Sequence, residues 1–180
     1  MTNDNDQSNY PVWAMETVEI KKPDPIWIDR GIFECNELYR LLFPFGVIQV
    51  EHIGSTSIPN LPAKPIIDLM ACIPSLNEID EIITKLASKD WHYVPPELDK
   101  LSWRRFFIKV KNDKRIGHLH LMLKGEERWD KQLLFRDRLR MNPSLIIEYT
   151  NLKRKLAQEF INDREAYTEA KTEFVNRVTR

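Results

Sequence analysis

The sequence has no excess of either charge. Its 180 residues contain 27 Lys and Arg and 27 Asp and Glu, so the formal net charge at pH 7 is zero, and the isoelectric point is about 6.9. A protein dedicated to nucleic acid needs a basic excess or a clustered basic face to contact the phosphates. The balance therefore argues against strong nucleic-acid binding, while it leaves a local anion-binding pocket open.

Long apolar runs and a secretory leader are also absent. The apolar stretches are well short of the ~20 residues that cross a bilayer, and the polar start MTNDNDQSNY lacks a basic segment followed by an apolar one. The two cysteines, Cys35 and Cys72, lie far apart and without the spacing of a metal site. Such cysteines are typical of small buried residues in a reducing compartment. We therefore expect a cytoplasmic protein that makes no contact with a membrane.

The composition is that of a folded globular chain. Hydrophobic residues make up 42% and charged residues 30% of the chain, and the mean hydropathy is −0.46. The length allows one ordinary domain. Residues 1–15 are polar and aperiodic and are expected to form a flexible tail. Residues 16–180 are expected to form a single domain, of which residues 129–180 are the helical part. The oligomeric state is left open.

Hydrophobic spacing and breaker residues predict an α+β fold, in which a mixed β-sheet is flanked by helices and followed by a helical C-terminal third. The pair Asp24-Pro25 marks a helix start, and Pro44 ends that helix. His92 is expected in a loop without a role. The other predicted elements are strands over 47–53 and 66–73, a helix over 79–87, a hairpin of 104–111 with 117–124, and helices over 129–141, from Asn142-Pro143 onward and over 167–178.

Asp68 is the clearest anomaly of the sequence because it interrupts the apolar run of residues 66–73. Burying an unpaired carboxylate costs several kcal/mol, so Asp68 must meet a cation, a metal ion or hydrogen-bond donors. Strand alternation places Asp68, Met70 and Cys72 on one face and the intervening apolar residues on the other. Asp68 therefore indicates a functional site, although a carboxylate that pairs with an arginine at a strand end fits the same pattern.

A hydroxyl-rich turn of sequence GSTS directly follows the predicted strand 47–53. Glycine permits a close backbone approach and a positive φ, and hydroxyls with backbone N–H groups can hold phosphate oxygens. Alone, such a sequence is usually a turn and nothing more. Because a lysine and then Asp68 follow it, we interpret this region as a phosphate-binding site. Its candidate residues are Gly54, Ser55, Thr56 and Lys64.

Two histidines alternate with leucines in residues 117–123. On a strand, His118 and His120 face one side, and the leucines up to Leu123 pack on the other. Histidines two residues apart can bind a metal ion, contact phosphate or share protons. Paired surface histidines without a function fit the spacing equally well. His52, just before the GSTS turn, is added to this candidate cluster.

Three arginines lie within residues 136–140. On a helix, Arg136 and Arg140 share a face, and their guanidinium groups can clamp an anion. The alternative is a solvated helix surface with salt bridges. The later basic run, Lys153-Arg154-Lys155, is expected to be solvated surface.

Four segments in this order resemble the GrpB family, a branch of the DNA polymerase beta-like nucleotidyltransferase superfamily. They are EHIGSTS at 51–57, AKPIID at 63–68, GHLH at 117–120 and FRDRLR at 135–140. The helical tail, with Glu148-Tyr149 and Lys153, is also similar, and the resemblance covers the chain from about Val18 to the C-terminus. It implies a small nucleotidyltransferase sheet in which the Gly-Ser turn holds the phosphates of a nucleotide.

The resemblance also implies a metal site. Members of the superfamily hold Mg²⁺ on two strand acids one residue apart, and the ions neutralise phosphate charge and activate the attacking oxygen. The first acid corresponds to Asp68, whereas the second position holds Met70, and a thioether is a poor ligand for Mg²⁺. A further acid has no counterpart, and His118 and His120 stand near its place. Either Asp68 and these imidazoles hold a divalent ion such as Mg²⁺, Mn²⁺ or Zn²⁺, or the two-metal chemistry has been lost.

These residues lead to two main hypotheses. The first is a nucleotidyltransferase-like enzyme that acts on a nucleotide or phosphorylated small molecule, with Asp68, His118 and His120 as catalytic and metal-binding residues. In this scheme the turn, Lys64, His52 and the two arginines bind the substrate. The second is a non-catalytic module that binds the same ligands. A metal-dependent phosphohydrolase is a third hypothesis, and relatives fused to dephospho-CoA kinase associate the family with coenzyme A synthesis.

Overall fold

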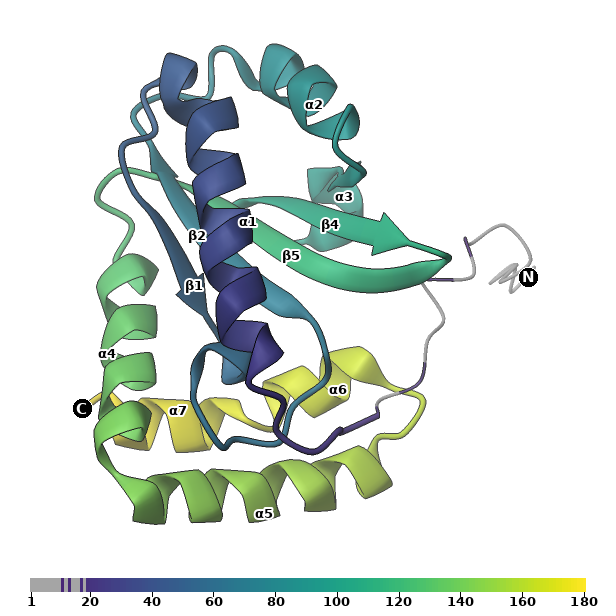
Figure 1. Cartoon of the computed structure of the whole chain (residues 1–180), viewed down its shortest axis with the longest axis vertical. Coiled ribbons are helices and arrows are strands. Elements are labelled where there is room, and N and C mark those ends of the chain that lie inside the picture. Colours follow the sequence, from purple (N-terminus) through teal and green to yellow (C-terminus); the bar gives the residue numbers. More distant parts are fainter. Residues whose placement is uncertain (1–10, 12, 14–16, 18) are drawn as a thin grey trace, which may run out of the picture.

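A five-stranded mixed β-sheet organises the computed structural model, which describes residues 11, 13, 17 and 19–180 (Figure 1). The central pair, β2 and β5, is parallel, and the other neighbouring strands are antiparallel. The flexible tail predicted over residues 1–15 lies outside the described residues apart from Pro11 and Trp13. The strands are β1 (Val50–Ile53), β2 (Ile67–Ile73), β3 (Trp91–Val94), β4 (Arg105–Lys111) and β5 (Lys114–Leu123), in the spatial order β1-β2-β5-β4-β3.

Helices cover the sheet and extend beyond one end of it. The long helix α1 (Ile26–Leu42) lies across the sheet face that is turned to the viewer in Figure 1, and α2 (Ile79–Ala87) packs beside it. The C-terminal part consists of α4 (Arg128–Met141), α5 (Pro143–Glu159), α6 (Arg164–Glu169) and α7 (Thr172–Val178). Shorter elements are the helix α3 (Pro96–Asp99) and the 3₁₀ turns η3 (Phe43–Phe45) and η4 (Ser55–Ser57). The predicted α+β class with a helical C-terminal third is confirmed.

Two of the helices begin at the cap-and-proline pairs that the sequence predicts. The Asp24 carboxylate accepts a hydrogen bond from the backbone N–H of Ile26 at 3.0 Å. The side-chain oxygen of Asn142 accepts hydrogen bonds from the backbone N–H groups of Ser144 and Leu145. These bonds satisfy N–H groups that the first turn of a helix leaves unpaired. Local sequence therefore sets where α1 and α5 begin.

The larger hydrophobic core lies between the sheet and helices α1 and α2. It contains Leu69 and Leu119 from the two central strands, which are fully buried together with Leu38 of α1 and Leu86 of α2. Alternation along β2 then turns Asp68, Met70 and Cys72 toward the opposite face, as predicted. Leu123 is a correction, because it lies at the end of β5 and is exposed instead of packing with the other leucines.

Four predicted elements differ from the structure, and the first is the hairpin strand expected over 117–124, which begins at Lys114 as β5. The strand expected over 47–53 is shortened to β1, because only residues 50–53 pair with β2. The helix expected over 167–178 is divided into α6 and α7 at Ala170-Lys171, since the apolar spacing continues across a point where the chain turns. His92, expected in a loop, lies in β3, an edge strand of four residues that is too short to show a periodic pattern.

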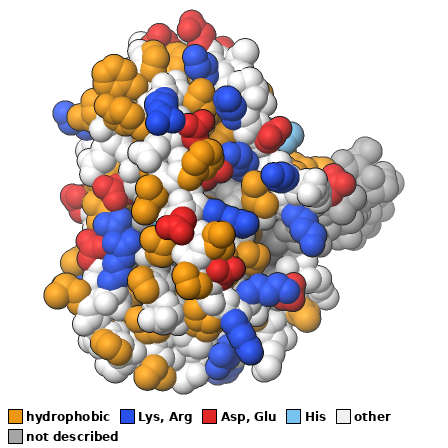
Figure 2. Space-filling model, viewed as in Figure 1, with side chains coloured by type: hydrophobic (Ala, Val, Ile, Leu, Met, Phe, Trp, Pro, Cys, Tyr) orange, Lys and Arg blue, Asp and Glu red, His pale blue; other side chains and the backbone are white. Residues whose placement is uncertain are grey.

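The distribution of surface charge agrees with the balanced composition of the chain. On the face shown in Figure 2, acidic and basic side chains are interspersed.

Cys35 and Cys72 are free thiols and are half-buried rather than fully buried as expected. Burial raises the pKa of Cys35 to about 12, so this thiol is not activated for chemistry. In the described part of the chain, every helix is too short or too polar to span a bilayer.

The contact between α1 and β1 predicts the effect of a substitution at Gly31. A Cβ added there would lie 1.9 Å from Nδ1 of His52, so Gly31→Ala overpacks the contact, although alanine favours a helix over glycine by ~1 kcal/mol. Overpacking typically costs ~1–3 kcal/mol, and we expect a net loss of unfolding free energy in urea denaturation. The loss should shrink in a His52→Ala background. A gain in stability from Gly31→Ala alone would contradict this packing.

Candidate functional site

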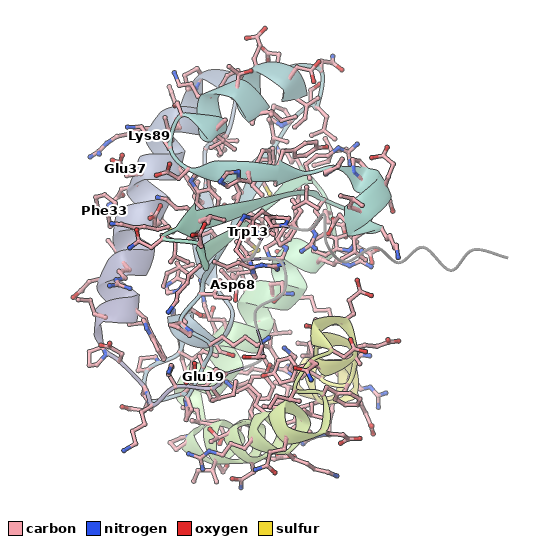
Figure 3. The ribbon with its side chains drawn as sticks, turned by 90° about the vertical axis from the view of Figure 1, so that its right-hand side faces the viewer. Trp13, Glu19, Phe33, Glu37, Asp68 and Lys89 are labelled. Carbon is pink, nitrogen blue, oxygen red and sulfur yellow. The ribbon has the colours of Figure 1, made fainter. Side chains whose placement is uncertain are left out.

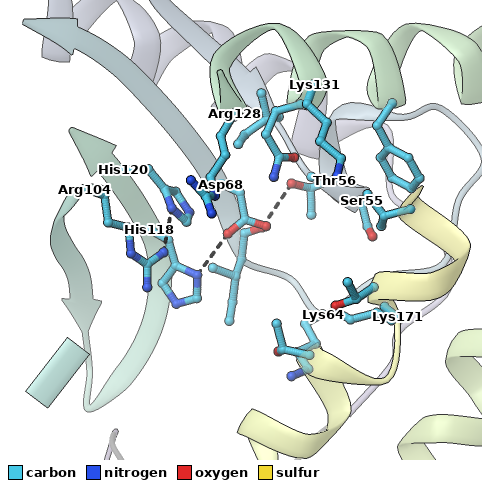
Figure 4. A pocket seen from close by; sticks show the side chains of 18 of the residues that line it. Ser55, Thr56, Lys64, Asp68, Arg104, His118, His120, Arg128, Lys131 and Lys171 are labelled. Atoms are coloured by element: carbon cyan, nitrogen blue, oxygen red, sulfur yellow. Dashed lines mark hydrogen bonds and ion pairs between the residues drawn. The ribbon is translucent and has the colours of Figure 1, made fainter. Parts of the chain in front are cut away.

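A pocket of about 630 Å³ opens between the polar face of β2 and β5 and the C-terminal helices (Figure 4). Seen from the side, Asp68 lies at the level where the sheet gives way to these helices (Figure 3). Six of the side chains that line the pocket are Lys or Arg and two are Asp or Glu, whereas the whole chain is balanced. The basic residues are Lys64, Arg104, Arg128, Lys131, Lys153 and Lys171. This local excess of positive charge suits the pocket to an anion.

Asp68 and His118 form a hydrogen-bonded pair on adjacent parallel strands. The register of β2 and β5 sets them side by side, and Nδ1 of His118 lies 2.9 Å from Oδ1 of Asp68 (Figure 4). An ionised carboxylate only accepts hydrogen bonds, so we assign the proton to Nδ1. Burial raises the pKa of Asp68, but the hydrogen bond and the charge of His118 outweigh burial and hold this pKa below its usual value. Asp68 thus meets the donor that its place in an apolar strand requires.

His120 is held by Arg104 and not by Asp68. A guanidinium has only donors, so the 2.6 Å contact between Nη1 of Arg104 and Nδ1 of His120 makes Nδ1 the acceptor. The proton of the neutral ring is therefore on Nε2. Asp99 fixes Arg104 through two hydrogen bonds, and the Trp103 ring stacks on His120 at 5.8 Å. Burial, together with the charge of Arg104, lowers the pKa of His120 to about 3.

The turn after β1 lies directly beside Asp68. Gly54 has φ 69° and ψ −172°, a conformation that is essentially restricted to glycine, and a Cβ there would lie 2.5 Å from Oδ2 of Asp68. The buried hydroxyl of Thr56 donates to the backbone oxygen of Ile66 at 3.0 Å. Thr56 therefore stabilises the fold, as does Ser57, whose hydroxyl donates to the backbone oxygen of Gly54 at 2.6 Å. The hydroxyl of Ser55 lines the pocket.

Lys153, which the sequence places on a solvated surface, is instead buried in the pocket wall. It is 2% exposed, and its Nζ donates hydrogen bonds to Oγ of Ser55 at 3.1 Å and to the backbone oxygen of Pro62. Burial, reinforced by the positive charge of Lys171, lowers the pKa of Lys153 to about 7. The expectation for this residue was wrong, and a functional candidate was missed.

The helical period contains the signal that identifies Lys153. It lies four residues after the buried Tyr149 and three before the buried Leu156, so it belongs to the inward stripe of α5. Arg154 and Lys155 lie off this stripe and are exposed. In a run of basic residues on a helix, the face on which each residue lies must therefore be determined before the run is interpreted as surface.

Tyr167 places two further lysines at the pocket. The ammonium nitrogens of Lys64 and Lys171 each lie 4.3 Å from the centre of its ring, within cation–π range. Burial lowers the pKa of Lys171 to about 8, and the negative charge of Asp68 acts in the opposite direction. Figure 4 shows both lysines on the side of the pocket away from the histidines. Lys64 was a candidate from the sequence, and Lys171, in the unforeseen break between α6 and α7, was not.

The structure does not place His52 beside His118 and His120, with which it was grouped from the sequence. Antiparallel pairing sets Ile53 opposite Asp68, so His52 points to the other face of the sheet. There its Nε2 donates to the Thr56 hydroxyl at 3.0 Å, because the hydroxyl proton is already given to the backbone. Burial lowers the pKa of His52 to about 4, so this ring is a neutral part of the core.

Arg136 and Arg140 are also placed away from the pocket lining. Arg136 donates to the Glu51 carboxylate at 2.8 Å and to the adjacent backbone oxygen of β1. Arg140 holds the backbone oxygen of Ser57 with two hydrogen bonds of 3.0 and 2.8 Å. The two arginines do share a helix face, as predicted, and this face contacts β1 and the turn that follows it.

The residues present do not fit the pair of divalent ions that the family resemblance implies. Met70 holds the second acid position, is fully buried, and packs with Ile53 and Met122 beside two tryptophans. His120 has a protonated Nε2 and an Nδ1 engaged by Arg104, so it offers no free lone pair. Within the described ranges, no group of three or more His, Cys, Asp or Glu side chains is arranged to hold a metal ion.

Comparison with solved structures defines the fold as nucleotidyltransferase-like. The structure of Cid1 in complex with the UTP analogue UMPNPP matches this chain with a TM-score of 0.54 at 12% identity, over 77% of this chain and 43% of that chain. At this identity the likeness concerns the fold alone.

The chain belongs to the GrpB family. A sequence model described as GrpB protein matches residues 17–180, and the crystal structure of conserved protein GrpB from Enterococcus faecalis matches with a TM-score of 0.78 at 30% identity, over 89% of this chain and 94% of that chain. UPF0157 protein YqkA from Bacillus subtilis is 35% identical over 168 residues, which are 93% of this chain and 48% of YqkA. The chain thus spans about half of YqkA. The family and the superfamily fold expected from the sequence are confirmed.

A protein named dephospho-CoA kinase carries a region similar to this chain. The dephospho-CoA kinase of Mycobacterium leprae is 27% identical over 175 residues, which correspond to 82% of this chain and 42% of that protein. As expected from the sequence, a similar region therefore occurs within a longer protein that is named for dephospho-CoA kinase.

The close approach of Gly54 to Asp68 predicts a graded effect of alanine. Gly125→Ala meets only the backbone penalty of a positive φ, because its Cβ would have nothing within 4 Å, and we expect it to cost ~1–3 kcal/mol of unfolding free energy. Gly54→Ala adds the clash with the carboxylate and should cost a further ~1–3 kcal/mol. Urea denaturation of both variants provides the measurement. Equal losses would contradict the close contact.

The contact between Arg104 and His120 predicts a pKa change that NMR can follow. Arg104→Met removes the donor and the positive charge, so the pKa of His120 should rise from about 3, but not to its usual value, because burial remains. Arg105→Met, one residue further along β4, is the matched control and should leave this pKa in place. An unchanged pKa in Arg104→Met would exclude the assigned contact.

Proposed function

We propose that this protein binds a nucleotide or another phosphorylated small molecule in the pocket between β2, β5 and the C-terminal helices. The observation that carries the proposal is the concentration of six Lys and Arg side chains around the pocket, in a chain without net charge. The volume of about 630 Å³ lies within the range of ~300–1,000 Å³ that small-molecule sites occupy. A cytoplasmic location, where such ligands are made and used, is part of the proposal.

The two ends of the pocket suit the two parts of a nucleotide. At one end, the Ser55 hydroxyl and the lysines provide donors for charge-assisted hydrogen bonds to phosphate oxygens. At the other end, Trp103 and Phe106 line the wall, and the guanidinium of Arg104 lies 3.8 Å from the centre of the Phe106 ring. Flat aromatic and guanidinium groups are suited to stack on a base.

Two of the similar proteins support this ligand class. Cid1 was solved with a UTP analogue, and the Mycobacterium leprae relative is named for dephospho-CoA, which is itself a phosphorylated small molecule. Because the matched region is 42% of that kinase, the likeness supports a class of ligand rather than kinase activity.

Group transfer is a second candidate, and one observation favours it. Asp68 orients His118 through Nδ1, and Nε2 of His118 is buried without a hydrogen-bond partner among the described residues. A histidine held by a carboxylate in this way is suited to take a proton from an attacking hydroxyl. Since the donor set does not fit paired metal ions, such a step would depend on the cations of the pocket to stabilise the phosphoryl group.

Ligand-induced stabilisation tests the binding function. We expect ATP, UTP or dephospho-CoA to raise the melting temperature, because a ligand at 100 times its Kd adds ~2.7 kcal/mol, which corresponds to ~5–10 °C for a domain of this size. Adenosine, uridine and potassium chloride at matched ionic strength are the controls and should cause no comparable shift. If none of the phosphorylated compounds stabilises the protein at millimolar concentration, with or without Mg²⁺, the proposed function is wrong.

Recovery of the same compounds separates binding from transfer. Labelled nucleotide incubated with the protein and with metabolite acceptors should be recovered unchanged if the protein only binds it. A product that forms with the unmodified protein and is lost with Asp68→Asn would establish the second candidate.

A further inference from the structure

We propose that the phosphate charge of the bound ligand is neutralised by Lys153 and Lys171 of the C-terminal helices, in place of a divalent metal ion. The inference rests on the proposed function, because it assigns residues to the phosphate end of the same pocket. It departs from the scheme that the family resemblance implies, in which ions held by paired acids carry this charge.

The sheet side of the pocket offers a metal ion one carboxylate, Asp68, and Nε2 of His118, which has no hydrogen-bond partner among the described residues. Oδ1 of Asp68 accepts a hydrogen bond from His118, and Oδ2 lies so close to Gly54 that a Cβ there would be 2.5 Å from it. Two residues further along the strand stands Met70, which is fully buried in an apolar cluster. A phosphate beside the sheet would therefore meet the carboxylate of Asp68, which repels it, and it needs cations from another wall.

Lys153 lies where such a cation is required. Its Nζ is 3.1 Å from Oγ of Ser55, so the ammonium group and the hydroxyl of the turn are already adjacent. Its other hydrogen-bond acceptor is the backbone oxygen of Pro62, and both partners are neutral, so neither cancels its charge. Because Lys153 is 2% exposed, water screens this charge poorly, and its attraction for an anion is stronger than at the surface.

Lys171 supplies the second cation from the link between α6 and α7. The Tyr167 ring, which is 2% exposed, holds its ammonium group at 4.3 Å. The charge of Lys171 lowers the pKa of Lys153, so the two cations repel each other while the pocket is empty. An anion that contacts both would offset this repulsion. Two lysines that an anion holds in the protonated state carry out the neutralising role of a bound metal ion.

Proton uptake provides an independent sign of this arrangement. Burial lowers the pKa of Lys153 to about 7 and that of Lys171 to about 8, so an anion that raises both values makes the protein take up protons near pH 7.5. Among the described residues, Asp68, Tyr149 and Tyr167 contact these lysines or act on their charge, and Lys64 shares the ring of Tyr167. Glu127, Arg128 and Lys131 line the same pocket. Burial raises the pKa of both tyrosines, so they stay neutral, and Asp68, with its lowered pKa, stays ionised.

Isothermal titration calorimetry with ATP, UTP and dephospho-CoA tests the inference. Each compound is titrated into the full chain in EDTA and again in Mg²⁺, at pH 7.5 in HEPES and in Tris, whose ionisation enthalpies differ. The variants are Lys153→Met and Lys171→Met, which remove the charge and keep an unbranched side chain. Lys155→Met is the matched control, because it lies in the same helix and is exposed. Circular dichroism and a melting curve confirm that each variant is folded.

We expect binding in EDTA that is similar to binding in Mg²⁺, a loss of affinity of about 10- to 100-fold in Lys153→Met and in Lys171→Met, and proton uptake that falls in both variants. Lys155→Met should behave as the unmodified protein. Binding that requires Mg²⁺, or that neither lysine variant weakens, would overturn this inference and leave the proposed function in place. Absence of binding in both EDTA and Mg²⁺ would overturn the proposed function and, with it, the inference.

Discussion

The shape of the pocket depends on the interactions of the buried ammonium group of Lys153. An unpaired charge in this position would be strongly unfavourable, and it is accommodated by the hydroxyl of Ser55, the carbonyl of Pro62 and the ring of Tyr149 at 4.9 Å. These three partners come from the turn, the following loop and α5, so satisfying the charge draws the helical part onto the sheet. On the opposite side of the turn, Arg140 holds Ser57. The hydrogen bonds of these charged groups therefore join α4 and α5 to the turn and loop that form the pocket wall.

Much of the fold could be predicted because its elements are determined by local chemistry. The pairs Asp24-Pro25 and Asn142-Pro143 place helix starts through caps that need nothing beyond the next three residues. The alternation around Asp68 identified a central strand in the same way. The edge strand β3 and the break between α6 and α7 were missed, since a strand of four residues has too few positions for a pattern, and a helix break depends on what the following segment packs against.

The candidate site was predicted less completely, because it depends on how strands and helices are placed relative to one another. Asp68 and His118 were correctly grouped, and the parallel register makes them neighbours. His52 is close to the turn in sequence, but the pairing of β1 with β2 directs it to the opposite face. The spacing of Arg136 and Arg140 shows that they share a face and says nothing about what that face meets. For Lys153 the opposite holds. Its spacing from Tyr149 indicates an inward position, but its basic neighbours led to the prediction of a solvated surface.

The link between α6 and α7 limits the changes of chain length that this part of the protein can accept. The two helices have six and seven residues, too few to be stable without the contacts they make. Adding or removing one residue between Tyr167 and Lys171 rotates Lys171 by about 100° around the helix axis relative to Tyr167, which would move Lys171 off the ring. Insertions and deletions between Tyr167 and Lys171 should therefore be selected against in relatives that keep this pocket, although short surface helices otherwise accept changes of length.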